Sequence, residues 1–442
     1  MVPCGPVHTR AVNGRAARAG APHRQGHGRQ RHIAVFTFPA YAHIAPALPT
    51  LTELVRRGHR VTCLVAEPFA DMVGEAGVEP VVYESGFPWA DGLTGPVLET
   101  VLTFFEEAIA PLPAAVARLG ADRPDLLAHD LAASEGARLL GRAWGVPVLQ
   151  LCPTMASGPG FSMSRAQAEE DTGPRERIDP EHPSIAEFVA RKARLLAEYG
   201  LDDVPPESAG PEHGDNVVFL PKAFQIAPET FDERFAFVGP RLDDVPDTGG
   251  WQPPAGSRVL LLSLGSSYTP DQAAFLRLCI GALAGTPWHV VVTLGRRVTV
   301  EELGPLPGNV EVHQWLRHPE VLRHAAAFLT HAGMGSVMES LSYGVPMVLV
   351  PYHVDQRVIA RRAAELDLGR VVPRGAGGAE PLRAAVDEVT SSPRISTAVA
   401  AMRRQVHAAG GAVRGADVFE SLLRRSERPS SPNAPATEVT HS

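Results

Sequence analysis

The residues with the clearest chemical meaning stand close together in the second half of the chain. An apolar run that is predicted to be a strand ends at His331, and Gly333 and Gly335 allow a tight turn after it. A helix begins near Ser336, where free N–H groups and the positive end of the helix dipole favour an anion such as a diphosphate. His331 can donate to a phosphate oxygen, and Glu339, one helical turn after Ser336, can accept from ribose hydroxyls. A strand–turn–helix whose glycines serve close packing alone has the same spacing and is the alternative interpretation.

A carboxylate and an amide follow the next apolar run. Asp355 and Gln356 come shortly after residues 347–350, which are predicted to be a buried strand. Side chains beyond the carboxyl ends of parallel strands lie where open α/β sheets bind ligands. Such a pair can accept from and donate to the hydroxyls of a sugar. Capping of the following helix by Asp355 is the alternative.

Two polar residues in the first half are candidates for acid–base chemistry. His43 closes the loop after the first predicted strand, and Asp130 ends another apolar run. If these strands are neighbours in a parallel sheet, Asp130 can accept a hydrogen bond from His43 and fix the tautomer that a general base needs. An exposed loop histidine without a chemical role is the alternative.

The composition excludes several classes of function. The 442 residues include 41 Lys and Arg and 49 Asp and Glu, for a formal net charge of −8, whereas nucleic-acid binding usually needs concentrated positive charge. No apolar run approaches the roughly 18 residues expected of a transmembrane helix. The chain has no G-x-x-x-x-G-K-[ST], H-E-x-x-H, G-x-S-x-G or D-x-D motif. We therefore expect no nucleic-acid partner, no transmembrane segment and no metal site.

The cysteines give no sign of a disulfide framework or a zinc ribbon. Cys4, Cys63, Cys152 and Cys279 are far apart and lack Cys-x-x-Cys spacing. Because the last three stand in apolar runs, we expect them to be buried thiols.

The candidate residues must be positioned by strands and helices, and the hydrophobic pattern alternates between the two. A β-rich run at 32–38, a helical pattern from Pro46 to Gly58 and a strand at 60–65 form a βαβ unit, with residues 39–43 as a loop. In the second half, strands are expected at 259–264, 288–294, 327–330 and 347–350, and helices at 271–283 and 335–343. The chain is therefore predicted to be α/β, with two parallel-sheet domains joined by a Pro- and Gly-rich linker at 239–256.

Both ends of the chain lack a core-forming pattern. Residues 1–31 are rich in Arg and Gly and have no apolar h-region, which excludes a secretory signal. A disordered tail or a start codon assigned too early is the expectation, with a transit peptide as the alternative. Residues 427–442 are rich in Ser, Pro and Thr and are predicted to be disordered. We expect a cytoplasmic protein.

Three segments resemble a known family. The stretch from Trp315 to Gln356 resembles the donor-binding signature of family 1 glycosyltransferases, and residues 40–46 and 57–62 are similar to their acceptor-side signature. The resemblance runs from about His32 to Leu423 and narrows to actinobacterial macrolide glycosyltransferases, which use UDP-glucose. It implies the GT-B fold, in which two Rossmann-like domains face each other across a cleft. The expected parts are a basic tail at 1–31, an acceptor-binding domain at 32–238, a linker at 239–256, a nucleotide-sugar-binding domain at 257–408, a C-terminal helix at 409–426 that can pack back on the first domain, and a tail at 427–442.

The resemblance also implies a role for each candidate residue. His43 is implied to be the general base and Asp130 the residue that orients it. Trp315 is implied to stack on the uracil, with the backbone of Leu316 against the edge of the base. The donor diphosphate and ribose are implied to be held by Ser263, Gly265, Ser266, His331, Gly333, Gly335, Ser336 and Glu339, and the donor sugar by Asp355 and Gln356.

The chain departs from the family pattern at a few positions. Arg317 and His318 stand where the family usually has Pro and Gln, and His318 is expected to take over a contact to the ribose or uracil. Gly335 stands where many relatives have Asn. The acceptor pocket is expected to be lined by residues 83–115 and 155–215, with a wall drawn from Phe87, Trp89, Phe104, Phe105 and Phe161.

The implied reaction is an inverting transfer of glucose or a similar hexose from a UDP-sugar to a hydroxyl of a hydrophobic natural product, in particular a macrolide, as in antibiotic inactivation. The UDP-sugar is a co-substrate, and neither a metal nor another cofactor is expected. Other aglycones (a flavonoid, a phenol or another polyketide) and a TDP-sugar donor are the alternatives. A nucleotide-sugar epimerase and a non-catalytic accessory protein are the rival classes. We expect a monomer or a weak homodimer.

Overall fold

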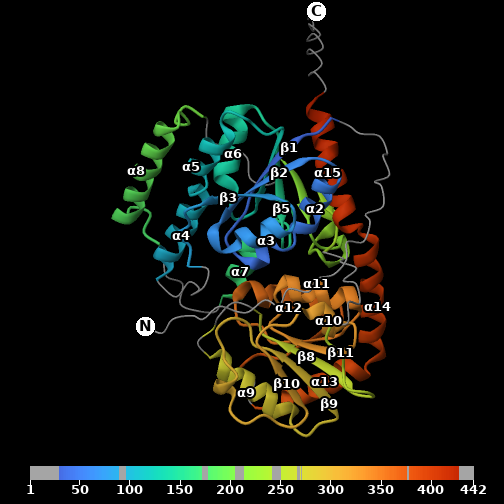
Figure 1. Cartoon of the computed structure of the whole chain (residues 1–442). Helices are drawn as coiled ribbons and strands as arrows, with labels where there is room; N and C mark the ends of the chain where they lie inside the picture. The colour runs from blue at the N-terminus through green and yellow to red at the C-terminus, as the bar shows by residue number, and fades with distance from the viewer. Residues whose placement is uncertain are drawn as a thin grey trace, which may run out of the picture. The chain divides into compact units, whose positions relative to one another are not determined.

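Two parallel β-sheets covered by helices form the framework of the chain (Figure 1). The computed structural model describes residues 29–88, 96–171, 178–204, 214–240, 250–265, 269, 271–375 and 378–427. The two sheets confirm the predicted α/β fold of two Rossmann-like domains. Most of the two tails, residues 241–249 of the linker, and also Trp89 and Ser266, lie outside the described residues.

The first sheet has seven parallel strands in the order β3-β2-β1-β4-β5-β6-β7. They are β1 (His32–Phe36), β2 (Arg60–Ala66), β3 (Glu79–Tyr83), β4 (Leu126–Asp130), β5 (Val148–Cys152), β6 (Asp215–Val218) and β7 (Phe235–Phe237). β1 pairs with β2 on one side and with β4 on the other, so the strand order reverses there. The carboxyl ends of β1 and β4 therefore meet at a switch point, where open α/β sheets bind their ligands.

The second sheet repeats this design with six parallel strands in the order β10-β9-β8-β11-β12-β13. They are β8 (Arg258–Ser263), β9 (Trp288–Thr293), β10 (Val310–His313), β11 (Ala325–Thr330), β12 (Met347–Leu349) and β13 (Gly369–Val371). β8 pairs with β9 and with β11, which places the second switch point at the carboxyl ends of β8 and β11.

Helices cover the faces of both sheets (Figure 1). Those from the first half are α1 (Tyr41–Ile44), α2 (Leu48–Arg56), α3 (Ala70–Glu75), α4 (Val97–Ile109), α5 (Leu112–Leu119), α6 (Ser134–Trp144), α7 (Met163–Glu170) and α8 (Pro183–Glu198). Those from the second half are α9 (Gln272–Leu283), α10 (His318–Leu322), α11 (Met334–Tyr343), α12 (Val354–Glu365), α13 (Glu380–Ser391), α14 (Pro393–Ala408) and α15 (Gly411–Ser426).

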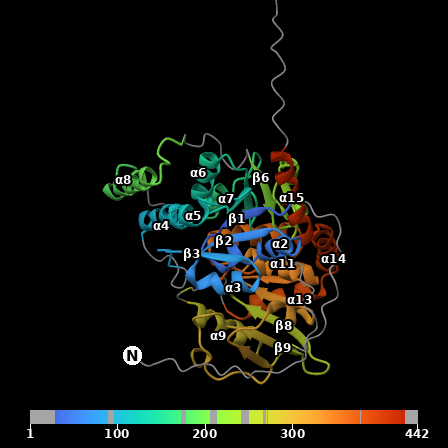
Figure 2. The same cartoon turned by 45° about the horizontal axis from the view of Figure 1, so that its top comes forward.

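Each sheet has a buried core, and both cores draw on distant parts of the sequence. Phe419 and Leu423 of α15 are buried in the core of the first sheet. Accordingly, α15 lies beside α2 in both views of the chain (Figures 1 and 2). Phe224 and Phe237, which come before the linker, are buried in the core of the second sheet. The two halves are thus joined by packing as well as by the linker.

The first predicted βαβ unit differs from the structure in two details. The loop expected at 39–43 contains α1, one short helical turn that begins at Tyr41. The following helix begins at Leu48 and not at Pro46, because Ala47 is its N-cap and Pro49 occupies its first turn, where the missing N–H costs no hydrogen bond.

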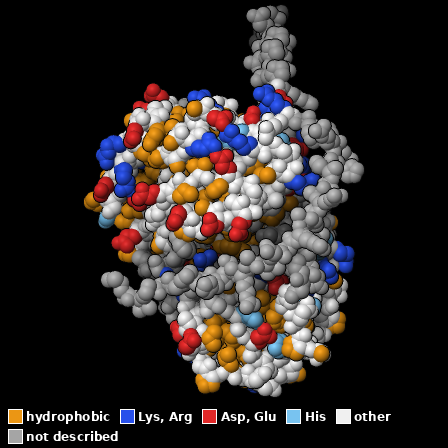
Figure 3. Space-filling view, in the orientation of Figure 1, with side chains coloured by type: hydrophobic (Ala, Val, Ile, Leu, Met, Phe, Trp, Pro, Cys, Tyr) orange, Lys and Arg blue, Asp and Glu red, His pale blue; other side chains and the backbone are white. Residues whose placement is uncertain are grey.

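One stretch is long and apolar enough to cross a membrane, against the expectation of none. It is Val97–Leu119, with a mean hydropathy of 1.3. Pro111 divides it into α4 and α5, and Glu107 of α4 is buried, where it accepts a hydrogen bond from Tyr83. α4 contacts α6 and α8, so its contacts are those of a helix packed within the first half. On the face seen in Figure 3, charged side chains of both signs are interspersed over that half.

Candidate functional site

His43 and Asp130 meet at the first switch point. β1 and β4 are in register, with Phe36 opposite His129, so the segments that follow them start at the same edge of the sheet. His43, on α1, places its Nδ1 3.0 Å from each carboxylate oxygen of Asp130. Asp130 is buried, and its Oδ1 also accepts from the backbone N–H of Ala132 at 2.8 Å. A carboxylate only accepts, so Nδ1 of His43 carries the proton and Nε2 is left to act as a base.

The surroundings of His43 raise its pKa above the ordinary value. Burial disfavours the charged imidazolium, but the charge and hydrogen bond of Asp130 outweigh it, and the charge of Asp355 adds to them. His43 is therefore a stronger base than a free imidazole, held by a fixed carboxylate.

Aromatic rings lie beside His43. The Phe38 ring is centred 5.0 Å from the His43 ring, and it contacts Phe87 at 4.6 Å and Phe104 at 5.5 Å. Of the rings expected in an acceptor wall, Phe87 and Phe104 are thus linked to His43 through their contacts with Phe38. Phe105 instead contacts Phe188 on α8, and Phe161 is buried in the core of the second sheet. Phe38 was missed because it ends the apolar run 32–38, in which any ring is expected to be core, whereas β1 already ends at Phe36.

His331 lies at the second switch point, directly after β11. A Cβ added to Gly333 would come 2.4 Å from His331 Nε2, and one added to Gly265 would come 2.5 Å from the same ring. Both glycines are therefore required for the ring to fit. Between His331 and Gly333, Ala332 has a φ of 67°, a conformation that costs energy for any residue with a Cβ. Such strain persists where the surrounding structure fixes the turn.

The second glycine of the turn has no steric role. Gly335 is exposed, and a Cβ built there would meet no atom within 4 Å. The expectation that Gly335 is needed for a tight turn is therefore wrong; the turn is made at Ala332 and Gly333. Gly335 and Ser336 lie in the first turn of α11, whose N–H groups have no partner within the helix.

The His331 ring is uncharged at neutral pH. Burial above all, together with the charges of His318, Arg374 and His353, lowers its pKa to about 3. Its Nδ1 is buried and has no hydrogen-bond partner among the residues that the structure describes. The ring can offer one hydrogen bond to a ligand but no positive charge in the ligand-free protein.

His318 connects three residues of the predicted donor site. Its Nδ1 lies 3.0 Å from Oε2 of Glu339, and its Nε2 lies 3.1 Å from Oγ of Ser263. Because the Glu339 carboxylate only accepts, Nδ1 donates to it, and Nε2 accepts from the Ser263 hydroxyl. Thr293 Oγ1 lies 3.4 Å from the same Nε2. No spacing in the sequence indicates this network, since its members lie on four different elements, β8, β9, α10 and α11.

Trp315 offers an open ring next to this network. It is 53% exposed and contacts Tyr41 of α1 edge to face, with the ring centres 6.1 Å apart. Leu316, the next residue, packs against the core of the second sheet. An indole that is exposed and has one edge-to-face contact can still stack its open face on another flat ring.

Asp355 and Gln356 lie in the first turn of α12, and only one of them is wholly available to a ligand. The Oε1 of Gln356 accepts from the backbone N–H groups of Tyr352 at 2.9 Å and His353 at 3.2 Å. Its amide group can therefore donate but not accept. The N-cap of α12 is His353, so Asp355 does not have the capping role that was its alternative interpretation.

Arg374 is a neighbouring cation that the sequence did not single out. Its guanidinium lies over the rings of Phe275 at 4.6 Å and Tyr352 at 4.8 Å. Burial lowers its pKa below that of a free arginine. No motif marks it, because it follows the short strand β13 in a stretch without periodicity.

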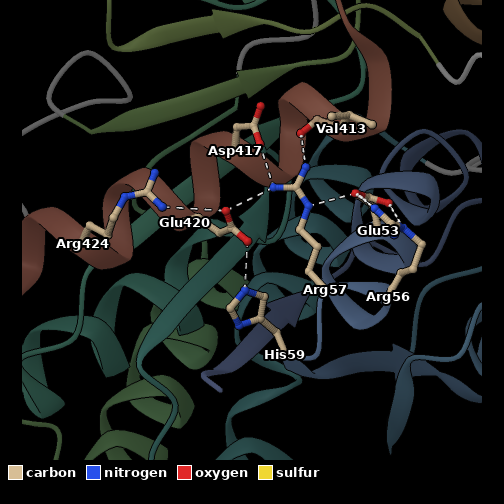
Figure 4. Close-up of polar contacts among 8 residues, drawn as sticks. All are labelled: Glu53, Arg56, Arg57, His59, Val413, Asp417, Glu420 and Arg424. Atoms are coloured by element: carbon tan, nitrogen blue, oxygen red, sulfur yellow. Dashed lines mark hydrogen bonds and ion pairs between the residues drawn. The ribbon is translucent and has the colours of Figure 1, made fainter. Parts of the chain in front are cut away.

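The second part of the expected acceptor signature is structural. Arg57 bonds to Glu53 of α2 and to Asp417 and Glu420 of α15, and His59 Nε2 lies 3.2 Å from Glu420 (Figure 4). These side chains hold α15 on the first half. Within the described chain, no three His, Cys, Asp or Glu side chains are grouped as metal ligands would be. Cys63, Cys152 and Cys279 are buried free thiols, as predicted.

Known proteins are similar to this chain over nearly its whole length. Residues 277–412 match the family described as erythromycin biosynthesis protein CIII-like, C-terminal domain. The oleandomycin glycosyltransferase of Streptomyces antibioticus is 37% identical over 401 residues, 89% of this chain and 91% of that protein. The demethyllactenocin mycarosyltransferase of Streptomyces fradiae is 34% identical over 90% of this chain and 88% of its own length. The crystal structure of CalG4, the calicheamicin glycosyltransferase, matches with a TM-score of 0.76 and 36% identity over 91% of this chain and 100% of that one.

Proposed function

Because the chain belongs to family 1 of the GT-B glycosyltransferases, we propose that it moves glucose or a similar hexose from a UDP-sugar to a hydroxyl of a hydrophobic natural product, with inversion at the anomeric carbon. The observation that carries this proposal is the His43–Asp130 pair beside the rings of Phe38, Phe87 and Phe104. A base next to an apolar wall suits an acceptor whose reacting hydroxyl is attached to an apolar body.

In the proposed reaction, Nε2 of His43 takes the proton of the acceptor hydroxyl while its oxygen attacks the anomeric carbon from the face opposite UDP. The bond from that carbon to the diphosphate oxygen breaks, and an α-linked donor gives a β-glycoside. UDP leaves with the bonding electron pair. The first N–H groups of α11, the Ser336 hydroxyl and His331 stabilise the charge that develops on it. Asp130 stabilises the imidazolium of His43.

The donor is proposed to lie along the second switch point. Trp315 stacks on the uracil beside the backbone of Leu316, Glu339 accepts from the ribose, and Ser263 and Gly265 border the diphosphate. Asp355 accepts from the sugar hydroxyls, and the amide of Gln356 donates to them. We propose that the reaction needs no metal. We also propose that the protein is cytoplasmic and is a monomer or a weak homodimer. A TDP-sugar remains the alternative donor.

A macrolide is the proposed acceptor class, and antibiotic inactivation the proposed role, because the similar proteins named above include an oleandomycin glycosyltransferase. The test is to incubate the purified protein with UDP-glucose or TDP-glucose and with macrolides, flavonoids or phenols, and to measure product mass and nucleotide release. We expect a product one hexose heavier with UDP-glucose and a macrolide, also in EDTA. Conversion of UDP-glucose without an acceptor would indicate an epimerase, and no turnover with any pair would indicate an accessory protein.

A further inference from the structure

A cavity lies at the end of the second sheet opposite the proposed donor site. It has a volume of about 590 Å³ and is bounded by the starts of β8, β11 and β12 and by α13 and α14. Arg258 begins β8, whereas Ser263 ends it, so the two ends are about 17 Å apart along the strand. The cavity is therefore separate from the switch point at which His331 and Ser336 lie.

The charged side chains that line this cavity are basic. Arg258, Arg403, Arg404 and His407 line it, and neither Asp nor Glu is among its lining residues. Ser396 and Thr390 add hydroxyl groups to the wall. A positive cavity is unusual in a chain with a net charge of −8, because carboxylates are available to pair with its arginines.

The three arginines of the cavity are exposed, and two of them, Arg258 and Arg403, have contacts other than ion pairs. The Arg258 guanidinium lies 4.0 Å from the centre of the Trp288 ring, and the Arg403 side chain lies against Gly344. Nε2 of His407 donates to the carbonyl of Ser342 at 2.9 Å, which leaves its Nδ1 available. Arg394, also on α14 but outside the cavity, instead pairs with Asp367 at 2.6 Å. Arg258 and Arg403 are thus positioned by neighbouring groups, and no ion pair joins Arg258, Arg403 or Arg404 to a carboxylate in the described chain.

We propose that this cavity binds a small anion with two or more phosphate groups. Guanidinium groups match phosphate oxygens two at a time, and several such groups in one concavity favour a ligand with several negative charges. The volume is within the range of small-molecule sites and large enough for a nucleotide or an inorganic polyphosphate. This inference is independent of the proposed transfer reaction.

Arginine labelling of the intact protein tests the proposal at the level of single residues. The protein is treated with phenylglyoxal at low salt, with or without inorganic pyrophosphate, and the modified arginines are mapped by mass spectrometry. Pyrophosphate should slow the modification of Arg258, Arg403 and Arg404 several-fold and leave Arg394 unchanged. A parallel arm with UDP shows whether a nucleotide protects the same three residues better than the inorganic anion. Equal labelling of the three with and without both anions would overturn the proposal.

A pair of variants tests the same cavity by affinity. Arg403→Ala/Arg404→Ala should weaken pyrophosphate binding about tenfold or more in calorimetry, the loss expected from removing charged hydrogen bonds. Arg394→Ala, which removes a cation from the same helix outside the cavity, should bind as the wild type does. Melting curves check that both variants are folded, and the labelling result stands if the double variant is not. Unchanged affinity in a folded double variant would show that pyrophosphate binds elsewhere.

Discussion

Nδ1 of His43 is equidistant, at 3.0 Å, from the two carboxylate oxygens of Asp130. The two residues come from segments that follow neighbouring strands, so the contact is set by the sheet and not by the loop alone. The described residues place no hydrogen-bond partner on Nε2 of His43, and the Phe38 ring borders the imidazole. The pair thus has the geometry that the proposed proton removal requires.

Substitution at this pair tests the proposed base. His43→Ala should lower kcat for an alcohol acceptor by about two orders of magnitude or more, since positioned base catalysis contributes that much. Asp130→Asn should fall between His43→Ala and the wild type, because it keeps the shape but loses the charge that stabilises imidazolium. UDP affinity, measured by calorimetry, should hardly change in either. Near-normal turnover of His43→Ala on an alcohol would refute the mechanism while leaving the family assignment intact.

The pH dependence of turnover follows from the raised pKa of His43. The base must be neutral, and its pKa in the protein is higher than that of a free imidazole because Asp130 and Asp355 outweigh burial. Activity should therefore rise with pH through a value above about 6.5. In Asp130→Asn the main stabilising charge is gone, so the midpoint of kcat/KM against pH should move to lower pH. A midpoint that moves upward would contradict this assignment.

Much of this site could be predicted because parallel sheets place strand ends predictably. The apolar runs that precede His331 and end at Asp130 were predicted as strands, and they are β11 and β4. Because β1 and β4 are neighbours in the sheet, His43 and Asp130 lie in contact. What could not be predicted depended on side chains that meet across elements. His318 reaches both Ser263 and Glu339, a contact that no spacing in the sequence encodes.

In two motifs, the sequence pattern marks the correct segment, but the role expected of one residue in it differs from the contacts that the structure shows. The glycine at 335 belongs to a recognisable turn, yet the space around it is open, and the strained residue is Ala332. Arg57 belongs to a segment that resembles an acceptor signature, yet its partners are on α15. Resemblance to a family identifies the segment that carries a motif. The contacts of each side chain in that segment follow only from the packing of the folded chain.

The network around His318 should contribute to nucleotide binding. His318→Ala removes the donor to Glu339 and the acceptor for Ser263, so UDP affinity should fall about tenfold, the size expected for a charged hydrogen bond. His318→Gln, which restores the usual family residue, should retain most of the affinity because its amide can both donate and accept. Calorimetry with UDP distinguishes the two. If alanine and glutamine behave alike, His318 does not position Glu339 for the donor.

The two glycines of the β11–α11 turn provide a matched pair. Gly333→Ala should displace the His331 ring, since the new Cβ would lie 2.4 Å from its Nε2, and both UDP binding and turnover should fall strongly. Gly335→Ala should be nearly neutral, because its Cβ meets nothing within 4 Å. Thermal melting and UDP titration of the two variants check this difference. Equal losses would mean that the turn needs flexibility at both positions.

The last prediction concerns the attachment of α15 to the first half. Arg57 is the centre of a cluster that joins Glu53 of α2 to Asp417 and Glu420 of α15 (Figure 4). It also donates to the carbonyl of Val413 at 3.0 Å, and its side chain is only 18% exposed. Arg57→Ala leaves these carboxylates without their shared cation and should lower the free energy of unfolding by about 2 kcal/mol.

Arg56→Ala is the matched control for this change. Arg56 is 71% exposed and bonds to Glu53 alone, so its loss should cost well under about 1 kcal/mol. Melting temperatures of the two variants, measured at low and at high salt, give the comparison. Arg57→Ala should also increase proteolytic cleavage near α15, because that helix loses its polar attachment while its buried face, with Phe419, still packs. If Arg56→Ala and Arg57→Ala melt at the same temperature, packing of the apolar face alone holds α15 in place.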